Sequence, residues 1–311
     1  MIFQNYLSAN INFFDYNTFI KKLFLPPQKK RHQRKIRGVM AKKSKGRKFW
    51  KTFGKIILIL FILSILLPIL YRWVNPPVTT FQCVQAISNG TGIHKKWVPI
   101  EKISPYMYRA AIASEDNYFL GHRGFDVIAL NTVMEERKSG RRHRGGSTIS
   151  QQTAKNVFCW PKSSWVRKGV ETYFTFLIET FWSKERIMEV YLNVIEMGPG
   201  IYGAEKAAQT YFHCHASQLT AHQAALITAC YPSPQKRNPA KPTSYLLGRA
   251  ANIEGKMARY GTPKFTDEYI SHVRERYLKS VEKMEKRKSR KKGKSKNGVW
   301  DFIKHETKKQ R

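Results

Sequence analysis

Acidic residues are scarce in this chain, since its 311 residues include only 21 Asp and Glu against 56 Lys and Arg, for a formal net charge of +35. Positive charge is densest at the two ends: residues 1–75 contribute +15, residues 76–262 contribute +10 and residues 263–311 contribute +10. No carboxylate cluster has the spacing of a calcium or magnesium cage. The charge favours an anionic partner, and a nucleic-acid or anionic-membrane binder is one class of protein to weigh.

Cysteines are also few, and they lack the spacing of a metal site. No C-x-x-C pair or Cys/His zinc pattern is present, although His213 and His215 flank one cysteine. This excludes a zinc site, and small buried thiols are expected, while four widely spaced cysteines fix no disulfide pairing. The four are Cys83, Cys159, Cys214 and Cys230.

Alternating apolar and polar residues, the mark of a half-buried sheet, are missing, and no glycine fingerprint follows a strand. Rossmann nucleotide-sugar sites and P-loops are therefore excluded. Helical signals dominate instead, and a mainly α fold is predicted. The helices are expected over residues 126–136, 147–157, 168–181, 184–193, 204–212 and 221–230, with a basic amphipathic helix over 269–288. Thr220 and Gln223 predict a capping box at the start of the helix over 221–230, and Tyr231-Pro232 ends it.

One apolar run stands out between these charged regions. From Ile56 to Leu70 only Ser64 and Pro68 interrupt it, and with its flanks it reaches about 20 residues, enough to cross a bilayer. A cleaved signal peptide is the alternative, but Tyr71-Arg72-Trp73 offers no small-residue cleavage site. We expect an uncleaved single transmembrane anchor over residues 53–74.

Charge around the anchor predicts its orientation. Residues 21–55 hold 15 Lys or Arg and no acid, whereas residues 56–100 hold only three basic residues. By the positive-inside rule, residues 1–52 form a basic cytoplasmic segment, within which Met40 is a second candidate start of translation. Residues 75–262 then form the catalytic domain outside the cytoplasm, and residues 263–311 a basic tail.

A candidate general base lies at the end of the first predicted helix of that domain. Ser104 followed by Pro105 predicts the start of the helix, and Glu115 falls at its C-terminal end. There the carboxylate meets the negative end of the helix dipole beside Asp116 and two aromatic residues, a setting suited to a proton acceptor. The alternative is a solvated helix end before a glycine turn.

A glycine loop precedes the second candidate segment. Residues 144–156, Arg-Gly-Gly-Ser-Thr-Ile-Ser-Gln-Gln-Thr-Ala-Lys-Asn, predict a helix with Ser147 as its N-cap and with free N–H groups for an anion. Thr148, Gln152 and Lys155 share one face of that helix. Such a row of hydroxyl, amide and ammonium groups suits a diphosphate sugar.

These two segments resemble the first two motifs of the peptidoglycan glycosyltransferases that polymerise lipid II, and most closely the monofunctional, membrane-anchored members. Residues 167–171, 183–193, 193–212 and 219–239 resemble the later motifs in the family's order. The resemblance implies a lysozyme-like glycosyltransferase domain and a β-1,4-glycan product made with inversion. Lipid II, the growing glycan chain and the bilayer are the implied partners, with other cell-wall synthesis and division proteins as candidates and nucleic acid excluded.

Within this resemblance, Glu115 is the expected base, and Lys155, Arg167 and Arg144 are the expected anion clamps. Two roles for Glu171 stay open: it acts as an acid, or it orients a clamp residue through a salt bridge. No cofactor is required, although a divalent cation, Mg²⁺ or Mn²⁺, is compatible. The expected catalytic residues are Glu115 and Glu171, and the expected substrate-binding residues are Asp116, Phe119, His122, Arg144, Ser147, Thr148, Gln151, Gln152, Lys155, Arg167, Lys168 and Asn193, with no metal ligand.

A different enzyme class, a glycan-cleaving lysozyme or lytic transglycosylase, also uses a glutamate at a helix end as an acid. The expected cationic clamps argue against that class, because a neutral glycan needs no diphosphate site.

The charge asymmetry makes the topology testable. A reporter that works only outside the cytoplasm should be active when it is fused after Arg311, the last residue of the chain. Activity of a cytoplasm-only reporter at the same position would contradict the anchor orientation. The expected location is the cytoplasmic (inner) membrane.

Overall fold

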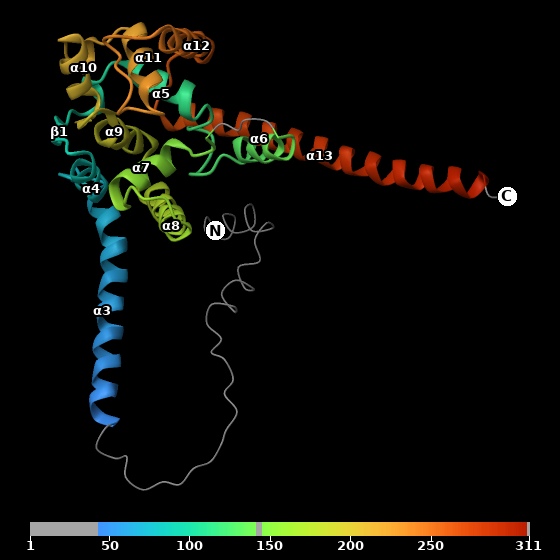
Figure 1. Cartoon of the computed structure of the whole chain (residues 1–311), viewed down its shortest axis with the longest axis horizontal. Helices are drawn as coiled ribbons and strands as arrows, with labels where there is room; N and C mark the ends of the chain where they lie inside the picture. Colours follow the sequence, from blue (N-terminus) through green and yellow to red (C-terminus); the bar gives the residue numbers. More distant parts are fainter. Residues whose placement is uncertain (1–42, 141–144, 310–311) are drawn as a thin grey trace. The chain divides into compact units, whose positions relative to one another are not determined.

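The computed structural model describes residues 43–140 and 145–309 (Figure 1). Met40 and the greater part of the predicted cytoplasmic segment, together with Arg144, lie outside the described residues. The elements are, in order, α3 (Lys43–Leu70), α4 (Thr80–Asn89), β1 (His94–Lys95), the 3-10 turn η1 (Ile100–Lys102), α5 (Pro105–Glu115), α6 (Val127–Lys138), α7 (Ile149–Phe158), α8 (Trp165–Phe181), α9 (Lys184–Val194), β2 (Glu196–Gly198), β3 (Ile201–Tyr202), α10 (Ala204–Phe212), the 3-10 turn η2 (Ala216–Gln218), α11 (Ala221–Cys230), α12 (Ser244–Tyr260) and α13 (Asp267–Lys309).

The mainly helical fold with an apolar N-terminal helix is confirmed. Helices α10 and α11 have the predicted bounds, and α11 begins with the capping box expected from Thr220 and Gln223. A small sheet is present although the sequence shows no alternating pattern. Strands β1, β3 and β2 form a small three-stranded sheet, with β1 and β3 parallel and β2 antiparallel to β3. Strands of two or three residues are too short to give an alternating pattern.

Two compact units make up the chain, Met1–Leu58 and Ile59–Arg311. In the second unit, α11 packs between α5 and α12, and α7 packs against α4, α8 and α9. Residues 224–230 of α11 are all buried, and three of them are alanines, whose small side chains let neighbouring helices approach closely. The two groups of helices meet where α5 ends and α7 begins.

Helix α3 contains Trp50–Leu70, a stretch of mean hydropathy 2.7 that is long and apolar enough to cross a membrane. Within the second unit its last turns are held by polar contacts. The Ser64 hydroxyl lies 2.9 Å from the Tyr173 hydroxyl on α8, and the indole N–H of Trp182 donates to the Pro68 carbonyl at 2.6 Å. Arg186 on α9 donates to the Tyr71 carbonyl at the helix end.

All four cysteines are free thiols. Burial raises the pKa of Cys159 and of Cys230 to about 11, so neither forms a reactive thiolate near neutral pH. The expectation of small buried thiols holds for these two, whereas Cys83 is exposed and Cys214 is half-buried.

Asn193 on α9 ties two segments together. Its amide N–H group donates to the Val98 carbonyl at 2.9 Å, and its amide oxygen accepts from the Val98 N–H at 3.0 Å. A third bond runs to the Glu189 carbonyl at 2.8 Å, and Asn193 is fully buried. The residue therefore stabilises the wall of the domain.

This arrangement predicts a large stability effect. Asn193→Ala should lower the free energy of unfolding by about 2–4 kcal/mol, because both backbone groups of Val98 lose their partner in a buried site. The exposed Thr180, whose hydroxyl bonds only the carbonyl one turn earlier, offers a control: Thr180→Ala should change stability by less than about 0.5 kcal/mol. Urea unfolding of the detergent-solubilised chain measures both, and equal midpoints for Asn193→Ala and wild type would contradict the assignment.

Candidate active site

Glu115 is the last residue of α5, as predicted. Pro105 occupies the first turn, where its missing N–H costs nothing. Ala110, Ala111 and Ala113 are buried in the core. Ser104 stands at the N-cap position, but its hydroxyl donates to the Leu219 carbonyl at 2.7 Å rather than to the helix. The packing of α5 therefore fixes the place of the Glu115 carboxylate.

Three side chains surround that carboxylate. Ser114 Oγ donates to Oε1 at 2.9 Å, Gln152 Nε2 donates to Oε2 at 3.1 Å, and Arg249 Nη2 lies 4.0 Å from Oε1. Gln152 is held in turn by the buried Tyr191, whose hydroxyl donates to its amide oxygen at 3.2 Å. The side chain of Glu115 stays 18% exposed, so the carboxylate is oriented and still accessible to a substrate.

Asp116, by contrast, is buried and has structural partners. Its two oxygens lie 2.9 and 3.1 Å from Nε2 of the buried His122, which donates to them. One of the same oxygens accepts from the backbone N–H of Ile149 at 3.0 Å, at the start of α7. The carboxylate thus joins the end of α5 to the beginning of α7.

The start of α7 differs from the prediction. Its N-cap is Thr148, not Ser147, because the residue three positions after Thr148 is Gln151, and the two side chains form a reciprocal capping box. Ser147 lies exposed before the cap.

Two of the N–H groups that the sequence predicted to be free at this helix start have partners. The N–H of Ile149 bonds Asp116, and the N–H of Gln151 bonds the Thr148 hydroxyl. That hydroxyl donates to the Gly124 carbonyl at 2.7 Å. The side chains of Thr148 and Gln151 therefore bond within the fold, and a buried carboxylate takes the first N–H of the helix.

Lys155 lies further along α7, with its ammonium 5.3 Å from the ring centroid of Phe81. Within the described residues the ammonium makes no hydrogen bond or ion pair. Burial lowers the pKa of Lys155; Glu171 opposes this shift, and the like charges of Arg167 and Lys168 add to it. An ammonium kept close to other cations and partly out of water is ready to receive an anion.

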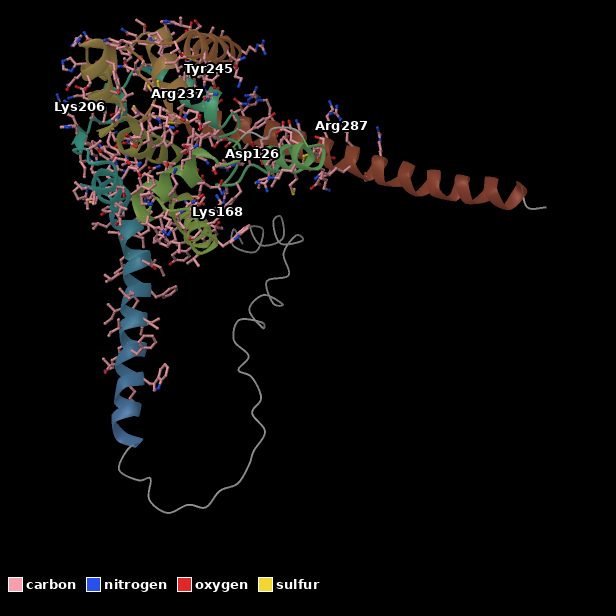
Figure 2. All side chains as sticks on the ribbon, in the orientation of Figure 1. Asp126, Lys168, Lys206, Arg237, Tyr245 and Arg287 are labelled. Atoms are coloured by element: carbon pink, nitrogen blue, oxygen red, sulfur yellow. The ribbon has the colours of Figure 1, made fainter. Side chains whose placement is uncertain are left out.

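Glu171 is the centre of that cationic group. Arg167 Nη1 donates to Oε2 at 2.8 Å, and Lys168 Nζ donates to Oε1. Glu171 is buried and Arg167 nearly so, whereas the Lys168 side chain is 41% exposed and projects from α8 (Figure 2). The orienting salt bridge, one of the two roles left open by the sequence, is present in the structure.

Of the remaining predicted residues, two are buried in the core and one lies outside the described residues. Phe119 is fully buried, and the Lys184 ammonium sits 4.6 Å from its ring centroid. Asn193 supports the wall described above. Arg144 belongs to the residues that the structure does not describe.

The arrangement thus places a partly exposed carboxylate at the end of α5 and a group of three cations on α7 and its neighbour α8. Among the described residues, no group of three or more His, Cys, Asp or Glu is arranged to hold a metal ion. Such a pair of sites can accept a proton at one point and stabilise an anionic leaving group at the other.

Comparison with known proteins identifies the domain. The family model described as Transglycosylase matches residues 82–258. A biosynthetic peptidoglycan transglycosylase of Bdellovibrio bacteriovorus is 45% identical over 227 residues, covering 70% of this chain and 90% of that protein. Those of Caulobacter vibrioides (51% identical; 67% of this chain, 92% of that protein) and Bacteroides thetaiotaomicron (53%; 65% and 84%) are similarly related.

The chain belongs to the transglycosylase family. It is a glycosyltransferase, and the match includes Glu115 and the cationic group, since both lie within residues 82–258.

The sequence-based prediction missed three residues of the candidate site: Ser114, Tyr191 and Arg249. A signal for Arg249 was present. Leu246, Ala250, Ile253 and Met257 recur at helical spacing and are all buried, so they predict the amphipathic helix α12 that carries it. The contact with Glu115 itself is tertiary and has no local signal.

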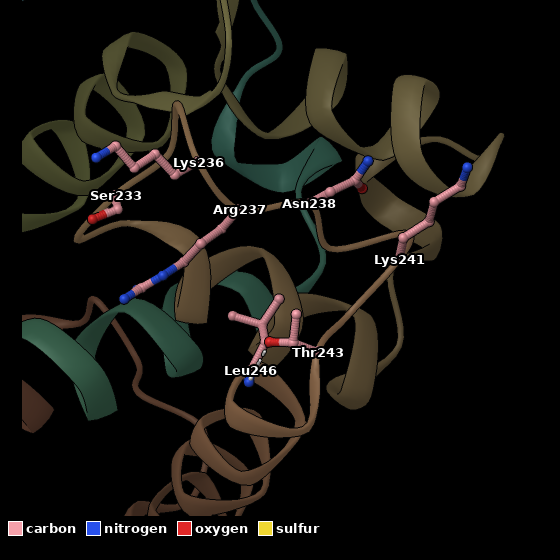
Figure 3. A pocket seen from close by; sticks show the side chains of 7 residues that line it. All are labelled: Ser233, Lys236, Arg237, Asn238, Lys241, Thr243 and Leu246. Carbon is pink, nitrogen blue, oxygen red and sulfur yellow. Dashed lines mark hydrogen bonds between the residues drawn. The ribbon is translucent and has the colours of Figure 1, made fainter.

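A pocket lies away from this site, between the end of α11 and the start of α12 (Figure 3). It is a cavity of about 360 Å³ lined by Ser233, Lys236, Arg237, Asn238, Lys241, Thr243 and Leu246. Its cations can attract an anion, but none of its side chains is a carboxylate that could accept a proton. The Glu115 site is therefore the candidate active site.

The lowered pKa of Lys155 gives a pH test. Above its pKa the amine is neutral, so binding of a soluble diphosphate diester, whose own charge is constant, should weaken at a lower pH than for an ordinary lysine. Lys155→Arg keeps its charge and should move this loss of affinity to higher pH. Calorimetric titration between pH 7 and pH 10 measures both proteins; identical pH profiles would contradict an ionised Lys155 at the anion site.

Proposed function

We propose that this transglycosylase polymerises lipid II into β-1,4-linked glycan strands for the bacterial cell wall. The observation that carries the proposal is the Glu115 carboxylate, held by Gln152, beside the cationic group of Lys155, Arg167 and Lys168. The 4-hydroxyl of the N-acetylglucosamine in one lipid II molecule attacks the anomeric carbon of the growing chain. A C–O bond to the sugar forms, and the bond to the polyprenyl diphosphate breaks.

On the acceptor side, Glu115 takes the proton of the attacking hydroxyl. Its two oxygens are oriented by Ser114 and Gln152, and its partial exposure leaves room for the acceptor sugar. Arg249 Nη2 lies 4.0 Å from Oε1, so its positive charge also helps to orient the carboxylate.

On the donor side, the leaving diphosphate develops negative charge, and preorganised cations stabilise that charge in the transition state. Lys155 and Lys168 are the groups best placed to reach it, and Arg167 contributes through the same cluster. Glu171 has both oxygens in ion pairs, which supports the orienting role over acid catalysis.

The proposal places the enzyme in the cytoplasmic (inner) membrane as a single-pass protein, with its N-terminus in the cytoplasm and its domain outside. Supporting this, Ser64 lies inside the apolar stretch of α3 and touches Tyr173 on α8, the helix that carries Arg167 and Lys168. Arg167 and Tyr173 are six residues apart, about 9 Å along the helix axis. The cations therefore belong to an element in contact with the anchor, as a membrane-borne diphosphate requires.

Under this proposal no cofactor is needed, and Mg²⁺ or Mn²⁺ is a candidate co-ligand of the diphosphate. Of the site carboxylates, Glu115 is the one that is partly exposed and could reach such an ion, because Asp116 and Glu171 are buried and paired. Other cell-wall synthesis and division proteins are proposed partners. Incubation with labelled lipid II separates this function from a glycan-cleaving enzyme, which would leave lipid II intact.

Two matched variants test the roles of the two glutamates. Glu115→Gln keeps the shape and the hydrogen bonds but removes the proton acceptor, so polymerisation should fall roughly a hundredfold to ten-thousandfold while diphosphate binding survives. Glu171→Gln should weaken diphosphate binding, because Arg167 and Lys168 lose their carboxylate. Lipid II turnover with product sizing and titration with a diphosphate diester measure the two effects; normal polymerisation by folded Glu115→Gln would refute the base.

A further inference from the structure

The long C-terminal helix α13 begins beyond residue 258, where the match to the transglycosylase family ends. It is packed against the catalytic domain all the same. Tyr277 of α13 is 5% exposed, whereas the next residue, Leu278, is 57% exposed. Within residues 267–290, the part of α13 whose side chains the structure describes, Tyr277 is the one buried residue and indicates a specific attachment point.

Tyr277 contacts the segment that follows the catalytic base. Its hydroxyl donates to Asp126 Oδ1 at 3.3 Å and accepts from the backbone N–H of Val127 at 3.0 Å, at the start of α6, which lies beside α13 (Figure 2). Its ring packs edge-on against His122, with ring centroids 6.0 Å apart, and lies 5.3 Å from the ring of Tyr118.

Gly121 allows this close packing. A Cβ atom added at Gly121 would lie 2.7 Å from the Cβ of Tyr277, a separation that real side chains do not adopt. Residues 118–127 therefore fit around this one tyrosine. Burial, together with the Asp126 carboxylate, raises the pKa of Tyr277, so the hydroxyl keeps its proton and continues to donate to Asp126.

The contacted segment is linked to the candidate active site at two points. His122 binds Asp116, the residue next to Glu115, and Asp116 accepts from the first N–H of α7. Further along, the Gly124 carbonyl accepts from the Thr148 hydroxyl, the cap of the same helix. A shift of this segment would therefore move α7, which carries Gln152 and Lys155.

We propose that Tyr277 is a positioning residue for glycosyl transfer: through it, α13 holds residues 116–127 and so fixes Glu115 and the start of α7 in the catalytic arrangement. The inference rests on the proposed function. Tyr277 acts through His122 and Asp126, since it has no contact with Glu115 or with the cationic group. Because small displacements of reacting groups are costly, its loss should act on kcat rather than on KM.

Three variants of the full-length chain test this. Tyr277→Ala removes ring and hydroxyl and should lower kcat for lipid II roughly tenfold to a hundredfold, with KM changed by less than about twofold. Tyr277→Phe keeps the ring and should lose only about threefold to tenfold, because it removes just the two hydrogen bonds of the hydroxyl. Leu278→Ala, on the exposed side of the same helix, should behave as wild type.

Amide hydrogen exchange gives a readout that needs no substrate. In Tyr277→Ala, exchange should accelerate at Val127 and at Ile149, the two N–H groups nearest the coupled segment, while the buried helix α11 keeps its protection. Acceleration at α11 as well would mean that the Ala variant unfolds globally, and Tyr277→Phe then decides the question. A folded Tyr277→Ala with the wild-type kcat would overturn the proposal. If Tyr277→Ala unfolds globally, the wild-type kcat for Tyr277→Phe would overturn it.

The proposed function and the positioning role of Tyr277 are tested separately. If wild-type protein does not polymerise lipid II, the proposed function is wrong, and the exchange experiment still tests the coupling. If wild-type protein polymerises lipid II and Tyr277→Ala does so at the same rate, the positioning role alone is wrong.

Discussion

The hydrogen bonds of the Asp116 carboxylate are the interaction on which the candidate active site depends. The carboxylate is buried, and its two oxygens accept from the His122 ring and from the first N–H of α7. A buried charge is tolerated only when such donors surround it, and removal of a donor would leave the charge uncompensated. This requirement fixes the distance between the end of α5 and the start of α7, and hence the hydrogen bond between Glu115 and Gln152.

A second buried carboxylate, Glu171, holds the cations in place by pairing with Arg167 and Lys168. Arg167 and Lys168 would repel each other and Lys155 if no acid stood between them, and burial makes that repulsion stronger than it would be in water. One carboxylate among three cations leaves the cluster with net positive charge, which a diphosphate can then neutralise. The chain has few acids, and in this domain two of them hold residues of the candidate active site in place from buried positions.

The sequence predicted those features that are coded locally. Glu115 was placed at a helix end because Ser104 and Pro105 mark the start, and α11 was bounded by its capping box and by the following proline. Where two signals compete locally, the prediction failed: Ser147 and Thr148 are adjacent hydroxyl residues, and only the partner Gln151 selects between them. The Ser114–Arg249 bond joins residues 135 positions apart, and no local pattern encodes it.

The tail was expected to be an accessory basic helix, and most of α13 agrees with that view. Its exposed ion pairs between Glu275 and Lys279 and between Glu282 and Lys286 support helix formation without any partner. A helix that is polar on all sides, however, has no reason to lie against a domain. The attachment must come from the few apolar residues on one stripe near its start, where Tyr269, Ile270 and Val273 pack against the core and Tyr277 is buried. Since Tyr277 touches the segment that follows Glu115, the proposed base, the tail is attached to the candidate active site at the point where α13 is most deeply buried.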